Sequence, residues 1–147
     1  MDEIVWTLNP TKDRLDHLLN YLDSFAQEFL RFSPIAFRFE CPTALPQTEL
    51  SSTLRHNLFL AFKEALANAV KYSGCKELRV RYEPKDNGFT LSIIDDGCGF
   101  DTHQKSDWVN GLDNMRHRLA DMGGECRIES TPGKGTCVSF ILKNLKG

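Results

Sequence analysis

The sequence lacks an excess of charge of either sign and lacks any long hydrophobic run. With 18 basic and 20 acidic side chains, its formal net charge is only −2, so it predicts no broad basic surface for nucleic acid or an anionic membrane. No apolar run is as long as a membrane-spanning helix, and the first residues do not have the layout of a signal peptide. These absences predict a cytoplasmic protein that binds no nucleic acid and makes no direct membrane contact.

The sequence also lacks closely spaced cysteines. Its five cysteines are scattered, and no two of them form the C-x-x-C pair that is typical of zinc and redox sites. They are Cys41, Cys75, Cys98, Cys126 and Cys137. A disulfide framework and a structural zinc site are therefore not expected, and reduced thiols in the cytosol are.

The apolar residues that are present recur in two patterns. Spacings of three and four predict helices, and strict alternation predicts strands. The helices are expected over residues 15–29, 50–72 and 112–122, and the strands over 35–39, 78–82, 89–93, 126–130 and 136–142. Turn-forming segments inside the last two strand pairs predict hairpins. The chain is long enough for one domain, and the order predicts an α+β two-layer sandwich, with a mostly antiparallel mixed sheet covered on one face by three helices.

A polar stripe lies on the second predicted helix. Glu64 and Asn68 are four residues apart and Lys71 continues the stripe, so the three share one helix face. Magnesium prefers oxygen ligands, and an asparagine carbonyl can supply one of them, while a lysine can meet a phosphate as a point charge. A solvent-exposed helix face is the commoner explanation of such a stripe taken alone.

A glycine-rich segment follows the strand at 89–93. Asp95 comes at the end of this strand beside Ile93 and Ile94, and Gly97 and Gly99 follow it. A partly buried carboxylate needs hydrogen-bond donors, and the amino group of adenine is such a donor. The glycines permit positive φ and a close approach of the backbone to a ligand. A tight turn without a ligand is the alternative.

The third predicted helix opens at Asn110, Gly111 and Leu112. Helix N-termini present free N–H groups that attract phosphate, and Arg116 and Arg118 lie one to two turns further on. An ordinary capped helix is the alternative. The segment 133–136, Gly-Lys-Gly-Thr, joins two predicted strands and so does not have the context of a phosphate-binding P-loop.

The order of these segments resembles the GHKL ATPase family, and within it the ATP-binding catalytic domain of sensor histidine kinases of the nitrate-sensor type. Residues 62–73 resemble the N box, 95–100 the G1 box, 110–119 the G2 box and 133–136 the final G-T element. The resemblance extends from about residue 11 to residue 142. Each segment alone is a weak signal, but four in this order on the expected elements are specific.

The resemblance implies the Bergerat α/β sandwich fold and an Mg²⁺-ATP site. Asn68 is then the magnesium ligand, Asp95 binds the adenine amino group, and Glu64 and Lys71 act at the γ-phosphate. Residues 101–110 correspond to a short ATP lid, and Asp96 replaces a more usual asparagine, a change expected to be tolerated. The other residues implied in nucleotide binding are Tyr72, Gly97, Gly99, Phe100, Asn110, Gly111, Leu112, Arg116, Gly135 and Thr136.

The resemblance also implies partners. Residues 1–10 resemble the end of a dimerisation and phosphoacceptor helix, although a frayed N-terminal arm is an alternative, and residues 11–147 form the catalytic domain. No histidine of the chain is followed by the Asp or Glu of a phosphoacceptor. The expected partners are therefore the dimerisation domain of the same sensor and a cognate response regulator, and the isolated chain is expected not to autophosphorylate. An anti-sigma-factor serine kinase and a non-catalytic docking module are the rival interpretations.

Overall fold

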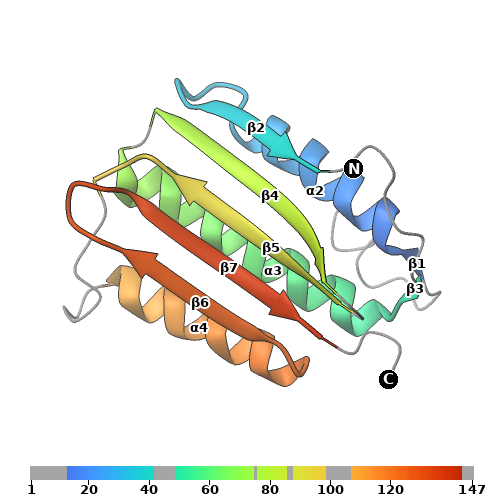
Figure 1. Ribbon diagram of the computed structural model, residues 1–147. Coiled ribbons are helices and arrows are strands. Elements are labelled where there is room, and N and C mark those ends of the chain that lie inside the picture. The colour runs from blue at the N-terminus through green and yellow to red at the C-terminus, as the bar shows by residue number, and fades with distance from the viewer. Residues whose placement is uncertain (1–12, 42–48, 75, 86–87, 99–106, 144–147) are drawn as a thin grey trace.

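The structure is a computed structural model that describes residues 13–41, 49–74, 76–85, 88–98 and 107–143. Five strands form one sheet in the order β2-β4-β5-β7-β6, and the helices cover one of its faces (Figure 1). The strands are β2 (Ala36–Glu40), β4 (Glu77–Lys85), β5 (Gly88–Asp95), β6 (Glu125–Ser130) and β7 (Thr136–Leu142). The helices are α2 (Leu15–Phe29), α3 (Ser52–Asn68), the π-helical turn η1 (Ala69–Ser73) and α4 (Asp107–Asp121). The predicted α+β sandwich is confirmed.

The pairing of the strands explains why the sheet is mixed. β2 runs parallel to β4, and the other three pairings, β4–β5, β5–β7 and β6–β7, are antiparallel. Both predicted hairpins are present. The parallel pair is connected through α3, as parallel strands require a crossover, and this connection places α3 against the centre of the sheet (Figure 1).

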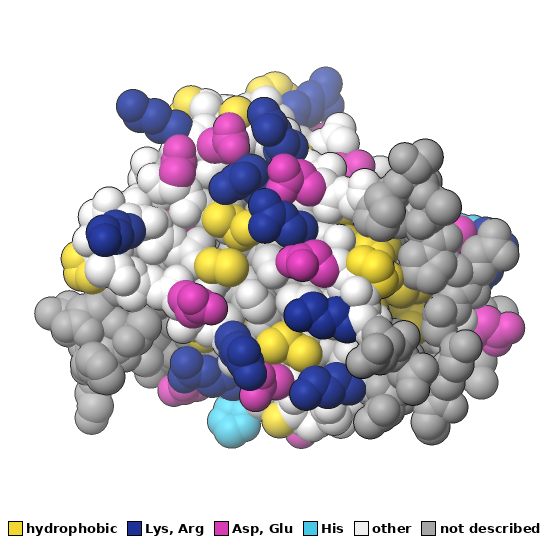
Figure 2. All heavy atoms as spheres, in the orientation of Figure 1, with side chains coloured by type: hydrophobic (Ala, Val, Ile, Leu, Met, Phe, Trp, Pro, Cys, Tyr) yellow, Lys and Arg dark blue, Asp and Glu magenta, His cyan; other side chains and the backbone are white. Residues whose placement is uncertain are grey.

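The two faces of the sheet differ in chemistry because strand side chains alternate. Leu78, Val80 and Leu91 point toward the helices and are fully buried. The opposite face carries ion pairs such as Arg81–Glu40, at 3.1 Å, and Arg127–Glu125, at 2.7 Å. Figure 2 shows this open face as a mixture of acidic and basic side chains with few apolar ones between them. The core therefore lies between the sheet and the helices.

Helix α3 begins and ends differently from the prediction. The side chain of Ser51 accepts a hydrogen bond from the Leu54 N–H at 3.1 Å, so α3 starts at a serine N-cap. Its last turn is not α-helical: residues 69–73 form η1, and Gly74 ends it at φ 62°.

The prediction that Asn110, Gly111 and Leu112 open the third helix is wrong. Helix α4 begins at Asp107 and continues through these residues. An acidic residue is favoured in the first turn of a helix, and a glycine inside a helix costs only about 1 kcal/mol, so Gly111 does not mark its start. Residues 107–110 of the predicted lid are therefore helical, and the remainder of the lid lies outside the described residues.

Two short strands were not predicted. β1 (Asp13–Arg14) and β3 (Glu49–Leu50) pair antiparallel and form a separate two-stranded sheet. Residues 1–10, predicted as the remnant of a preceding helix, lie outside the described residues. In the described part of the chain, no helix is both long and apolar enough to span a membrane.

Candidate functional site

A pocket lies between the end of α3, the end of β5 and the start of β7. The space between the lining residues is about 240 Å³ with the solvent-open part included, and Met115 of α4 also lines it. Three of the residues predicted to bind nucleotide, Asn68, Asp95 and Thr136, line this pocket together. The remaining lining residues are Ala65, Ala69, Ile93, Met115 and Val138. The pocket thus has apolar walls and a few polar groups, which is typical of a small-molecule site.

Asp95 provides a buried acceptor at the β5 side of the pocket. The residue is 7% exposed, and its Oδ1 accepts a hydrogen bond from the Gly97 N–H at 2.9 Å. Burial raises the pKa of the Asp95 carboxyl, and hydrogen bonds from the backbone of Gly97 and Thr136 partly offset this shift. A carboxylate has more acceptor sites than the one that the Gly97 N–H occupies, so Asp95 remains able to accept a hydrogen bond from a ligand.

The backbone of Gly135 passes close to Asp95. Gly135 has φ 83°, and a Cβ on it would overlap the carbonyl oxygen of Asp95. Asp95 is paired in register with the next residue, Thr136, whose hydroxyl lies 2.8 Å from that of Ser130. Glycine is therefore required at position 135 because both the positive φ and the close approach exclude a side chain.

Asn68 provides an amide at the helix side of the pocket. It is the last residue of α3 and is 7% exposed. Its Nδ2 is buried and has no hydrogen-bond partner among the described residues. Buried polar side-chain atoms are nearly always paired, so an unpaired amide that lines a pocket favours a ligand as its missing partner.

The polar stripe of Glu64, Asn68 and Lys71 lies on regular α-helix only as far as Asn68. Glu64 lies one turn before Asn68 and is half-buried. Lys71 is exposed and belongs to η1, where hydrogen bonds span five residues instead of four, so the spacing of a regular helix changes after Asn68. Such π-turns are frequently found at functional sites.

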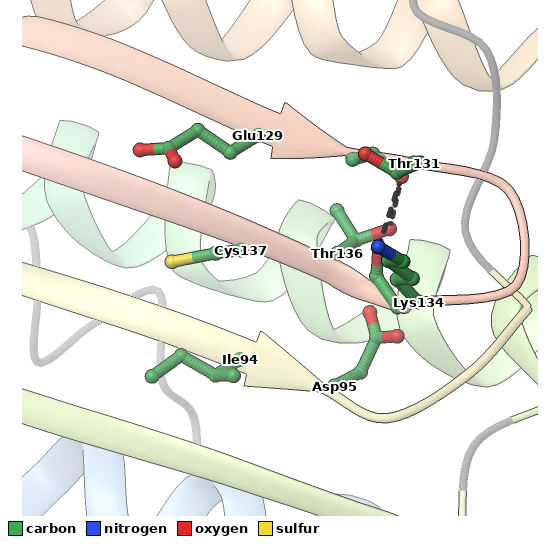
Figure 3. A pocket seen from close by; sticks show the side chains of 9 residues that line it. Ile94, Asp95, Glu129, Thr131, Lys134, Thr136 and Cys137 are labelled. Carbon is green, nitrogen blue, oxygen red and sulfur yellow. Dashed lines mark hydrogen bonds between the residues drawn. The ribbon is translucent and has the colours of Figure 1, made fainter.

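A second hollow of about 410 Å³ shares Asp95 and Thr136 with the pocket (Figure 3). It opens at the ends of β5 and β6 and the start of β7, beside the turn that joins β6 to β7. The backbone N–H of Lys134 donates to the carbonyl of Thr131 at 2.9 Å within this turn. The segment 133–136 is thus a hairpin turn closed by its own hydrogen bond, as predicted, and not a phosphate loop.

The other predicted site residues are less fully placed. Arg116 is exposed on α4, and its guanidinium lies 3.5 Å from the carboxylate of Asp113. Because α4 starts at Asp107, the free N–H groups of its first turn belong to residues 107–110. Gly97 directly follows the Asp95–Asp96 pair. The remaining predictions cannot be compared: Gly99 and Phe100 lie outside the described residues, as do the side chains of Tyr72, Asn110 and Leu112.

Several pocket residues were missed by sequence reasoning. Ala65 of α3 and Ala69 of η1 lie on either side of Asn68 in the sequence, and Met115 comes from α4. The small side chains of the two alanines leave room for the pocket beside Asn68. Their small size next to the polar stripe was the sequence signal that could have indicated a pocket there. Met115 follows the apolar spacing of its helix, which cannot distinguish a pocket wall from ordinary core.

The comparisons with known proteins identify the family of the chain. Residues 53–146 match the family described as histidine kinase-, DNA gyrase B-, and HSP90-like ATPase. The chain belongs to this ATPase family. The resemblance to GHKL ATPases is therefore confirmed, and ATP binding is the shared property of the family.

The relatives of the chain include sensor histidine kinases. LiaS of Bacillus subtilis is 30% identical over 115 residues, which are 78% of this chain and 31% of LiaS. VraS of Staphylococcus aureus is 34% identical over 83 residues, 56% of this chain and 24% of VraS. The chain thus spans less than a third of either relative.

Solved structures show the same fold. The ATP-binding domain of PrrB from Mycobacterium tuberculosis has a TM-score of 0.70 and 21% identity, over 90% of this chain and 96% of that domain. The histidine kinase domain of a blue-light-activated kinase from Erythrobacter litoralis has a TM-score of 0.73 and 20% identity, over 92% of this chain and 68% of that one.

Proposed function

We propose that this chain is the ATP-binding catalytic domain of a sensor histidine kinase. It binds Mg²⁺-ATP and presents the γ-phosphate to a histidine on a dimerisation domain of the same sensor. The observation that carries the proposal is that the buried carboxylate of Asp95 and the unpartnered amide of Asn68 line one pocket with apolar walls. The match to the ATPase family and the kinase relatives support it.

The base end of the nucleotide is assigned to Asp95. Its carboxylate accepts a hydrogen bond from the exocyclic amino group of adenine, while Ile93, Met115 and Val138 contact the purine ring. An acceptor that is buried without a ligand costs stability, and the adenine amino group satisfies it. This geometry selects adenine over guanine because guanine presents a carbonyl oxygen at that position and would place two acceptors together.

The phosphate end is assigned to Asn68 and its neighbours. The side-chain oxygen of Asn68 is suited to hold Mg²⁺, which neutralises phosphate charge during transfer. Phosphate oxygens of the nucleotide and water would supply the other ligands of the ion. Glu64 acts as the polar or basic group near the γ-phosphate, and Lys71 and Arg116 supply positive charge.

The acceptor is assigned to another part of the sensor. Catalysis is then mainly positioning of the γ-phosphate for in-line attack, as is usual in phosphoryl transfer. The chain acts in the cytoplasm, and its product passes to a response regulator. The isolated chain should bind Mg²⁺-ATP without labelling itself.

Calorimetry with a non-hydrolysable ATP analogue and Mg²⁺ tests the proposal. The wild type should bind, and Asp95→Ala should weaken binding by about thirtyfold, because about 2 kcal/mol is expected from a lost buried acceptor. Glu125→Ala, which removes an exposed carboxylate on the open face, is the matched control and should bind like the wild type. Absence of binding at millimolar analogue, or equal affinity of Asp95→Ala and wild type, contradicts the proposal.

The acceptor requires a separate assay. Radiolabelled ATP is incubated with this chain and a separately purified dimerisation domain of the sensor. Acid-labile label on the dimerisation domain alone is expected, since phosphohistidine hydrolyses in acid. Acid-stable label on a serine substrate instead would favour the serine-kinase interpretation.

A further inference from the structure

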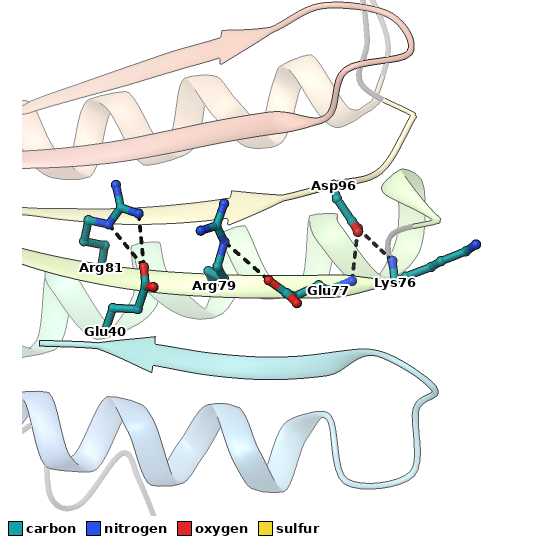
Figure 4. A network of polar contacts seen from close by, with 6 residues as sticks. All are labelled: Glu40, Lys76, Glu77, Arg79, Arg81 and Asp96. Carbon is teal, nitrogen blue, oxygen red and sulfur yellow. Dashed lines mark hydrogen bonds and ion pairs between the residues drawn. The ribbon is translucent and has the colours of Figure 1, made fainter.

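Asp96 follows Asp95 in the sequence but lies on the opposite side of the chain. Asp96 is exposed, and its Oδ1 accepts two backbone hydrogen bonds, from the N–H of Lys76 at 2.8 Å and from that of Glu77 at 3.0 Å. Figure 4 shows the carboxylate directed at the start of β4. The side chain therefore joins the end of β5 to the segment that follows η1.

We propose that Asp96 is a positioning residue for nucleotide binding: it fixes the Asp95–Gly97 turn against the exit of the helix that carries Asn68. The adenine end and the phosphate end of the pocket then keep one relative position. This inference rests on the proposed function, because it assigns the pocket to ATP.

The strand ladder alone does not hold this turn. The last paired residues of β4 and β5 are Leu78 and Asp95. One step further, the backbone N–H of Asp96 reaches the carbonyl of Glu77 only at 3.4 Å, a weak hydrogen bond. The two shorter bonds to the carboxylate take the place of the ladder where it ends. They fix the residue next to Asp95, on which the direction of the Asp95 side chain depends.

The other end of the contact is anchored as well. The carbonyl of Lys76 accepts the N–H of Ala36 at 2.9 Å, so strand β2 also holds this residue. Lys76 lies two residues after Gly74, which ends η1. A short chain path thus connects the Asp96 carboxylate to Asn68 at the start of that turn.

The charge of Asp96 suits this arrangement. Hydrogen bonds from the backbone, first that of Glu77, hold the pKa of the Asp96 carboxyl below its ordinary value. Asp96 is therefore ionised at neutral pH, and charge-assisted hydrogen bonds to N–H groups are stronger than neutral ones. An asparagine preserves the acceptor oxygen at the same place, so the substitution Asp96→Asn keeps the geometry and loses only the charge.

Three variants separate geometry, charge and simple stabilisation. Asp96→Asn keeps an acceptor in place without charge, Asp96→Glu keeps the charge but displaces the acceptor by one methylene, and Asp96→Ala removes both. The dissociation constant of a non-hydrolysable ATP analogue is measured with Mg²⁺ at a temperature where every variant is folded. The melting temperature without nucleotide and the hydrogen exchange of the Lys76 and Glu77 amides are measured in parallel, with Glu125→Ala as the control.

The dissociation constant of Asp96→Asn should be within about threefold of the wild-type value. Asp96→Ala and Asp96→Glu should bind about tenfold more weakly, since the lost hydrogen bonds loosen the Asp95–Gly97 turn. Exchange at Lys76 and Glu77 should accelerate in the same two variants. If Asp96→Ala fails to fold, the order of the Asn and Glu variants still decides. The inference is overturned if Asp96→Ala keeps the wild-type affinity while its melting temperature falls. It is also overturned if Asp96→Glu binds the analogue more tightly than Asp96→Asn, because affinity would then follow the charge. An absence of wild-type binding overturns the proposed function and this inference with it.

Discussion

The last residue of β5 and the residue after it are two neighbouring carboxylates that lie in opposite environments. Asp96, on the open side, has protein partners for its charge in the amides of Lys76 and Glu77. Asp95, on the covered side, is buried in a pocket, where burial raises its pKa. A carboxylate buried without a counter-ion lowers stability, so the comparison indicates that Asp96 maintains the structure of the site while Asp95 is available to a ligand.

The largest expected effect is a loss of stability, and it should differ between the two faces of β7. Phe140 points into the core and is fully buried, whereas its neighbour Ile141 is half-buried on the open face. Phe140→Ala should lower the free energy of unfolding by about 3–5 kcal/mol, and Ile141→Ala by about 1 kcal/mol or less. Urea denaturation measures both variants, and equal losses would contradict the assignment of the core to the covered face.

An intermediate effect is expected at Asp95. Because burial raises the pKa of this carboxyl in the folded chain, the folded chain holds a proton that the unfolded chain has released, in the pH range between the two pKa values. The Asp95 contribution to stability therefore falls as pH rises through this range and is least favourable above it. Without nucleotide, Asp95→Asn should have a higher melting temperature than the wild type at neutral pH. The difference between the two melting temperatures should become smaller in acid.

Thermal unfolding from neutral to acidic pH measures this difference. The same variant should bind the ATP analogue more weakly, since the amide in place of the carboxylate removes the ionised acceptor. A variant that is less stable than the wild type at neutral pH would show that the protein itself compensates the charge of Asp95. The matched substitution Asp96→Asn should not raise the melting temperature at any pH.

The smallest effect is expected on the open face. The guanidinium of Arg81 contacts Glu40 through Nε at 3.2 Å and Nη2 at 3.1 Å, and both side chains are partly exposed. Glu40→Gln should lower the free energy of unfolding by about 0–1 kcal/mol, and salt should reduce the difference because exposed ion pairs are screened. Denaturation at low and high salt measures it, and a larger loss would mean that the ion pair is effectively buried.

Much of the fold was predictable because its signals are local. Leu15, Leu18, Leu19 and Leu22 mark one face of α2, and the turn segments of both hairpins were recognisable from their glycines and prolines. The parallel pairing of β2 with β4 depends on contacts some forty residues apart, for which no local pattern exists. The start of α4 was missed because Gly111 was interpreted as a boundary.

The candidate site was predictable only in part. Asn68 and Asp95 were predicted from the order of their segments along the chain, since each segment alone is a weak signal, and the structure places both residues in one pocket. The walls of the pocket come from residues that differ in nothing from core residues until the helices are packed. The bonds of Asp96 to Lys76 and Glu77 join residues about twenty positions apart, so sequence alone suggested only that an aspartate would be tolerated there.

The parallel pairing of β2 with β4 also has a consequence for the order of folding. Hairpins such as β4–β5 and β6–β7 close over short loops, whereas the β2–β4 pair forms only after the whole of α3 has been accommodated between its strands. Each hairpin should thus form early, whereas β5 and β7, which carry Asp95 and Thr136, pair across α4 and β6 and should come together later. The helix that carries Asn68 should dock late, so the ability to bind nucleotide should appear among the last events of refolding.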